Sequence, residues 1–128
     1  GHMKKELFAV VILVLMILAS IYNYRHLERI TNDVLALVDR SLEQAETGNW
    51  DEARRLAEEA ARLWTSYDGY THIFLRHSEI TDAEGALYNY LQQVYDENTR
   101  TAKAARDAAR ARLEHLVQVE KLRPGSIF

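Results

Sequence analysis

The chain has 128 residues, a formal net charge of -3, no cysteine, one proline and five glycines. The missing thiols exclude disulfides, cysteine nucleophiles and zinc sites built from sulfur, and the slight excess of acidic side chains argues against nucleic-acid binding. Because residues that interrupt helices are so scarce, the composition predicts an all-α protein.

The N-terminal part predicts a single membrane-spanning helix. Residues 1–3 have the sequence of an expression-tag remnant, and residues 4–24 follow as a predicted transmembrane signal anchor. Two lysines precede an uncharged apolar run over residues 7–22, and tyrosines lie at its far end. A run of about 16 residues reaches about 24 Å, and lysine side chains can extend this span toward the ~30 Å of a hydrocarbon core.

Two other interpretations of the apolar segment are less favoured. A cleaved signal peptide would need small residues before Ala19-Ser20, but Ile17 and Leu18 are large. A buried helix of a soluble protein would usually carry a polar face, which this run lacks. The sequence therefore predicts an uncleaved anchor.

Flanking charges predict the orientation of the anchor in the cytoplasmic membrane. Lys4 and Lys5 precede the apolar run, whereas the arginines that follow it are accompanied by acidic residues. The positive-inside rule then favours a cytoplasmic N-terminus. Residues 25–128 are the predicted extramembrane helical bundle, and we expect them to be extracytoplasmic.

The first two helices of the bundle meet at a well-marked turn. The apolar period continues from the anchor without a breaker until residues 47–49. Asn49 and Glu52 have the spacing of a capping box, so a second helix is expected to start near Trp50.

Two further helices complete the predicted architecture. Asp68-Gly69 suggests a turn or kink before a third helix that ends near Tyr95, and a fourth helix follows to about Leu122. Pro124 and Gly125 would end that helix. Four amphipathic helices with short connections can bury their apolar stripes only against one another. We therefore expect the transmembrane helix to continue into a small antiparallel, up-down bundle of about four helices.

Ionisable residues interrupt the apolar stripe of the third predicted helix. His77 and Glu84 are two turns apart and share nearly the same azimuth. A buried carboxylate is costly without a partner, and the partners are expected on the first or fourth helix. The candidate polar core or binding site comprises His77, Glu79, Glu84 and His115. It is more typical of a structural polar network than of a ligand or ion site, and catalysis is least favoured.

A second candidate site is a set of aromatic residues. Most of them lie near the junction of the second and third predicted helices, and the set is Trp50, Trp64, Tyr67, Tyr70 and Phe74. Core packing explains such a set more simply than a ligand-binding cage does.

Motifs for catalysis and cofactor binding are not found in the sequence. It contains no G-x-S-x-G, P-loop or dinucleotide-binding pattern, and no histidine completes the Glu-x-x-His pairs of a di-iron bundle. We expect no enzyme activity, no cofactor and no metal. Lys103, Arg106 and Arg110 form a basic strip, which is more typical of a solvated face than of a contact with anionic lipid or polymer.

Several short motifs in order resemble a family of short proteins from Gram-positive, often spore-forming bacteria, described only as a domain of unknown function. They are the MKK start with one apolar helix, GNWDEA with a later Trp64, HSEI followed by Glu84 and Leu87, LEHL, and the final SIF. The alanine- and arginine-rich fourth helix departs from that pattern. The resemblance implies a membrane-anchored helical domain without an assigned activity, and a recurrent motif that includes His77, Glu79 and Glu84.

Two functional hypotheses follow. The leading one is a membrane-tethered, noncatalytic helical module that contacts another membrane or envelope protein or self-associates. The alternative is an extracytoplasmic sensor of a ligand, an ion or pH that uses a buried site at His77 and Glu84, because a histidine titrates near neutral pH.

Overall fold

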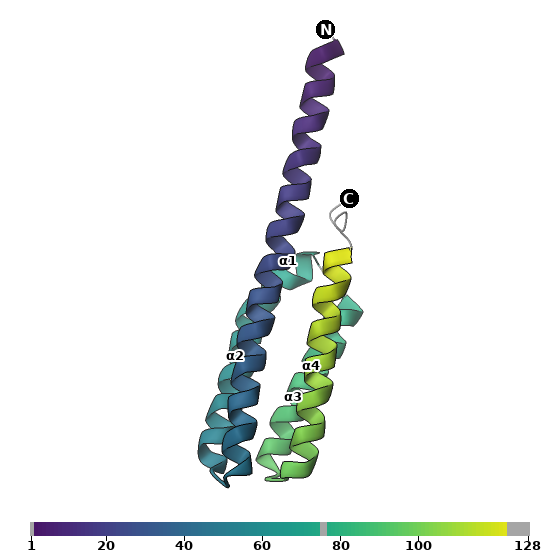
Figure 1. Cartoon of the computed structure of the whole chain (residues 1–128). Coiled ribbons are helices and arrows are strands. Elements are labelled where there is room, and N and C mark those ends of the chain that lie inside the picture. The colour runs from purple at the N-terminus through teal and green to yellow at the C-terminus, as the bar shows by residue number, and fades with distance from the viewer. Residues whose placement is uncertain (1, 75–76, 123–128) are drawn as a thin grey trace.

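The protein is a bundle of four helices in a computed structural model that describes residues 2–74 and 77–122, and the side chains of residues 3–66 and 81–121. The helices are α1 (His2–Glu46), α2 (Trp50–Phe74), α3 (His77–Tyr95) and α4 (Thr99–Leu122). Each of α1 and α3 packs against both α2 and α4, so the four helices close a ring. Consecutive helices run in opposite directions (Figure 1). The predicted all-α, up-down bundle is confirmed.

The turn between α1 and α2 forms as its sequence predicts. Gly48 has a φ of 84°, a left-handed conformation that glycine adopts without strain, and its N–H donates to the carbonyl of Ala45 at 3.0 Å. The side-chain oxygen of Asn49 accepts a bond from the N–H of Glu52 at 3.3 Å, which caps α2. Asn98 caps α4 in the same way, through the N–H of Thr101 at 3.1 Å.

The predicted start of the third helix is wrong. Asp68 and Gly69 lie inside α2, which continues to Phe74, and α3 begins only at His77. A single glycine costs a helix only about 1 kcal/mol relative to alanine, an amount that tertiary packing readily offsets. The stretch from residue 70 to residue 94 therefore spans parts of two helices.

The core is an apolar seam along the bundle axis. On α1 the buried apolar residues Leu27, Val34, Val38, Leu42 and Ala45 are three, four or seven positions apart, and the buried Thr31 lies four positions after Leu27. The first half of α4 contributes only alanines, Ala102, Ala105 and Ala109, before leucines take over. The largest fully buried side chains are Trp64 of α2 and Tyr90 of α3.

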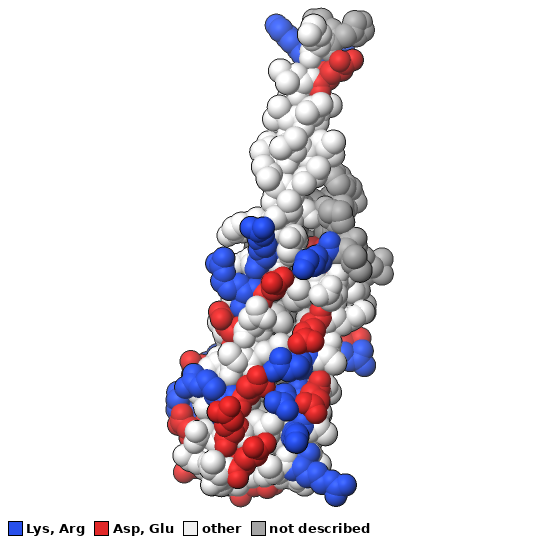
Figure 2. All heavy atoms as spheres, in the orientation of Figure 1, with Lys and Arg blue, Asp and Glu red and all other residues white. Residues whose placement is uncertain are grey.

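The N-terminal part of α1 projects beyond the other helices (Figure 1). Apart from the partly buried Met16, its large apolar side chains are exposed from Leu7 to Leu18, and Figure 2 shows this projection without charged groups except at its tip. By length and composition it could cross a membrane. Burial begins at Ser20, which is 1% exposed, whereas the predicted border between anchor and bundle follows residue 24. We call the end of the bundle beside this projection the proximal end and the opposite end the distal end.

Candidate functional site

Glu84 of the predicted polar site contacts a tryptophan. Its Oε1 accepts a hydrogen bond from the indole Nε1 of Trp64 at 3.2 Å, which joins α3 to α2. Trp64 is fully buried, and an indole N–H buried in a core requires an acceptor. The sequence predicts partners for Glu84 on the first or fourth helix, whereas this hydrogen bond comes from the second helix. This bond supports a structural role for Glu84.

Of the other members of the predicted polar site, the structure describes the side chain of His115. His115 is exposed on α4, where it lines a small cavity of about 70 Å³ with Asp82 and Arg112. The side chains of His77 and Glu79 lie outside the described residues.

The two tryptophans of the predicted aromatic set lie in different parts of α2. Trp50 begins the helix at the distal turn and is partly buried against the core, whereas Trp64 lies about 21 Å farther along the helix. These two rings therefore do not belong to one cage. The side chains of Tyr67, Tyr70 and Phe74 fall outside the described residues.

A buried chain of hydrogen bonds joins three helices near the distal end. The hydroxyl of Tyr90 on α3 donates to the Oγ of Ser41 on α1 at 2.9 Å, and Ser41 donates to the carbonyl of Ala53 on α2 at 2.7 Å. Tyr90 and Ser41 are fully buried. Burial raises the pKa of Tyr90, and the bond to Ser41 opposes this shift. Ser41 continues the apolar period of the first helix, and Tyr90 lies three positions after the apolar Leu87, but the sequence does not show that the two residues meet.

Two members of the predicted basic strip are engaged in ion pairs between helices. Asp39 of α1 accepts a bond from Arg106 Nη1 at 3.0 Å through one oxygen and from Arg110 through the other. Arg106 also pairs with Asp107, and Arg110 with Glu114 at 3.5 Å. The carboxylate of Asp39 thus holds α4 to α1. Both arginines belong to internal contacts rather than to a purely solvated face.

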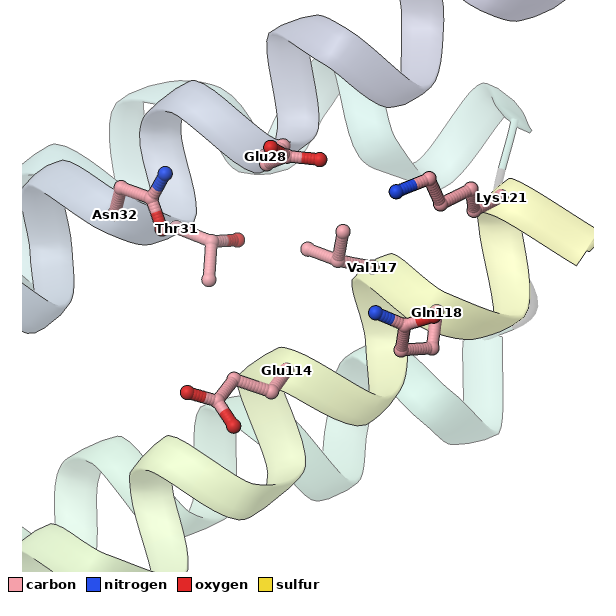
Figure 3. A pocket seen from close by; sticks show the side chains of 7 residues that line it. All are labelled: Glu28, Thr31, Asn32, Glu114, Val117, Gln118 and Lys121. Carbon is pink, nitrogen blue, oxygen red and sulfur yellow. The ribbon is translucent and has the colours of Figure 1, made fainter.

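A pocket opens between α1 and α4 toward the proximal end, and sequence reasoning missed it (Figure 3). Its volume is about 270 Å³, and its lining includes Glu28 and Thr31 from α1 and Glu114 and Lys121 from α4. The hydroxyl oxygen of Thr31 is buried and has no hydrogen-bond partner among the described residues. The signal for this pocket is the recurrence of polar residues on facing stripes of the first and fourth helices.

Buried polar groups continue beyond this pocket along α1. Ser20 and Asn23 are 1% and 4% exposed. Within the described part of the chain, the hydroxyl oxygen of Ser20 and the side-chain carbonyl oxygen of Asn23 have no hydrogen-bond partner. Toward the proximal end, the buried side of α1 therefore combines the polar residues Ser20, Asn23 and Thr31 with the apolar Leu27.

Comparison with known proteins identifies the family of the bundle. A family model described as "Domain of unknown function (DUF4363)" matches residues 21–127. No curated protein and no solved structure gives a significant match. The matched range begins where the exposed apolar projection ends and extends beyond the last residue of α4. The chain therefore belongs to the family known as domain of unknown function DUF4363.

Proposed function

We propose that the chain is a membrane-tethered, noncatalytic helical module whose extracytoplasmic bundle contacts another membrane or envelope protein. One observation carries this proposal: α1 is a single helix of 45 residues that is apolar and exposed at its start and forms part of the bundle core later. A continuous helix fixes the distance and orientation between the two segments that it joins better than a flexible linker does. The continuity of α1 therefore supports a bundle that is held at a fixed height beside the membrane.

The apolar projection supports the tether. Between Leu7 and Leu18 its large side chains are at least 39% exposed, with the exception of the partly buried Met16, and such exposure is unfavourable in water and favourable in lipid. Tyr22 is 64% exposed and stacks on His26 with a centroid distance of 6.0 Å. A tyrosine at this position suits the membrane interface, where aromatic residues are enriched.

A surface formed by α2 and α3 supports a protein contact. Tyr88 and Tyr95 lie seven residues apart on one side of α3, and their side chains are 45% and 49% exposed. Hydrogen bonds to Thr65 and Glu58 of α2 hold the two hydroxyls in place. Tyrosine is enriched at protein interfaces, and an oriented ring loses little conformational entropy on binding. We call this surface the tyrosine face.

Labelling of single cysteines tests the tether and its orientation. Because the chain has no cysteine, Ala111→Cys on the exposed side of α4 gives one reactive thiol. We expect a membrane-impermeant maleimide to label it in intact cells, and to label Glu6→Cys only after lysis. Both variants should stay in the membrane fraction after alkaline carbonate extraction. The opposite labelling pattern, or release by carbonate, contradicts this part of the proposal.

Site-specific crosslinking tests the partner. A photoreactive phenylalanine analogue in place of Tyr88 should give an adduct with a membrane or envelope protein in native membranes. The same analogue in place of Ala111, which is also exposed, serves as the control. An adduct that contains only this chain would show that the tyrosine face mediates self-association and does not contact another protein. Equal adducts from both positions contradict a role for the tyrosine face.

A further inference from the structure

We infer that the pocket between α1 and α4 is a binding site for a small zwitterionic molecule that carries a primary ammonium group and an acidic group. Amino acids share this chemistry with phosphoethanolamine and with the headgroup of phosphatidylethanolamine. The inference does not depend on the proposed protein partner, because the pocket and the tyrosine face use different helices.

Polar stripes from two helices form the walls of the pocket. On α1, Thr31 and Asn32 follow Glu28 by three and four positions. On α4, Gln118 follows Glu114 by four positions and Lys121 follows Gln118 by three. Such spacings place side chains on one side of a helix, so each helix directs a polar stripe at the other. Figure 3 shows the two stripes facing each other across the gap.

Thr31 distinguishes this pocket from an ordinary polar groove. The residue is 2% exposed, and its Oγ1 has no hydrogen-bond partner among the described residues. In Figure 3 its side chain points toward α4 across the pocket. A buried hydroxyl without a partner is unfavourable, so a ligand that bonds to it recovers a free energy that the empty bundle lacks. The hydroxyl can donate to an acidic group or accept from an ammonium group.

Charges around the pocket set the chemistry of the ligand. The carboxylate of Glu28 on one wall and that of Glu114 on the other suit an ammonium group, and Glu114 also contacts Arg110 at 3.5 Å. The ammonium group of Lys121 suits a carboxylate or phosphate. The amide of Gln118 can donate to one ligand group or accept from the other. A volume of about 270 Å³ admits a compound of few heavy atoms and lies just below the range of about 300–1,000 Å³ that is typical of drug-sized ligands.

Binding can be measured on the full chain in a nonionic detergent. The probes are the twenty common amino acids and phosphoethanolamine, with acetate and methylamine as controls that carry only one of the two charges. We expect at least one zwitterion to shift the NMR signals of the Thr31 methyl group and the Gln118 side-chain amide in a saturable manner. Both controls should bind at least about tenfold more weakly, since each lacks one charged hydrogen bond.

Variants locate the site. Glu28→Gln keeps the size of the side chain and should weaken binding at least about tenfold, and Thr31→Val should weaken it about fivefold or more. Glu43→Gln changes an exposed glutamate of the same helix outside the pocket and should bind like the parent chain. Equal affinity for the parent chain and Glu28→Gln would show that the probe binds elsewhere and would overturn the inference.

A second set of measurements separates a soluble ligand from a lipid headgroup. The full chain in nanodiscs of phosphatidylcholine should respond to the soluble probe, whereas nanodiscs with phosphatidylethanolamine should shift the same two signals without any probe if the headgroup is the ligand. Either response supports a zwitterion site. No shift from any soluble probe and no difference between the two lipids would show that the pocket holds only water.

Discussion

The distal end of the bundle joins its buried hydroxyls into a continuous chain from Tyr90 through Ser41 to Ala53. Near the proximal end, buried oxygens of Ser20 and Thr31 have no hydrogen-bond partner among the described residues, and a pocket opens beside Thr31. Alanines on α4 and capped turns close the distal end, whereas facing polar stripes line the proximal pocket. The comparison indicates that hydrogen bonding stabilises the distal end more than the proximal end, where we have proposed that a ligand binds.

Removing core volume from the distal end should have the largest effect. Leu42 is 3% exposed, and Leu42→Ala should lower the free energy of unfolding by about 2–5 kcal/mol, because a closely packed site collapses poorly around a cavity. Leu27 is 1% exposed near the proximal pocket, and Leu27→Ala should lie at the lower end of this range. Urea unfolding followed by circular dichroism measures both. A larger loss of unfolding free energy in Leu27→Ala than in Leu42→Ala would contradict the greater contribution of the distal end to stability.

Removing the hydroxyl of Tyr90 tests the distal hydrogen-bond chain. Tyr90→Phe should cost about 1 kcal/mol of stability, since a satisfied buried bond is lost while the ring remains. Tyr88→Phe removes an exposed hydroxyl that contacts Thr65 and should cost about 0.5 kcal/mol or less. The same urea titration compares the two variants. Equal losses would show that the buried chain contributes nothing beyond a surface contact.

Alkaline pH should weaken the distal end through the same tyrosine. Burial raises the pKa of Tyr90 above that of the unfolded chain, which is near 10. The unfolded state therefore loses this proton first, so Tyr90 contributes stability below about pH 10 that is lost as pH rises toward the folded-state pKa. Stability measured against pH should fall less steeply above pH 10 in Tyr90→Phe. If stability falls equally steeply with pH in the parent chain and in Tyr90→Phe, Tyr90 does not cause the loss of stability at alkaline pH.

Loss of the carboxylate that holds α4 to α1 should have a smaller effect. Asp39→Asn should cost about 0.5–1 kcal/mol, because the side chains are partly exposed and the arginines keep other acidic partners. The cost should shrink in high salt. Asp33→Asn changes an exposed residue of the same helix and should leave stability nearly unchanged. A cost that is independent of salt would argue against an electrostatic contact.

The sequence predicted those features that depend on local pattern. The turn at residues 47–49 carries its own glycine and Asn49 cap, and the apolar period of α1 shows which side faces the core. The α2 boundary was missed because Gly69 is tolerated inside a helix that neighbours stabilise.

Contacts between helices were harder to predict. Periodicity places Glu84 and Ser41 toward the interior but does not tell which neighbouring helix supplies Trp64 or Tyr90, since that depends on the rotation and offset of the packed helices. The pocket requires the relative height of two stripes that are more than 80 residues apart in the chain. The relative height of the two stripes is set only when the helices pack together, so the local sequence does not reveal it.

The free energy of unfolding of Thr31→Val tests the central comparison most directly. Valine keeps the shape of threonine and removes the hydroxyl, so the account predicts a gain of about 0.5–1 kcal/mol without ligand, opposite in sign to the loss from Tyr90→Phe. A loss of stability in Thr31→Val as large as that in Tyr90→Phe would contradict the account, because it would show that the proximal hydroxyl is satisfied as fully as the distal one.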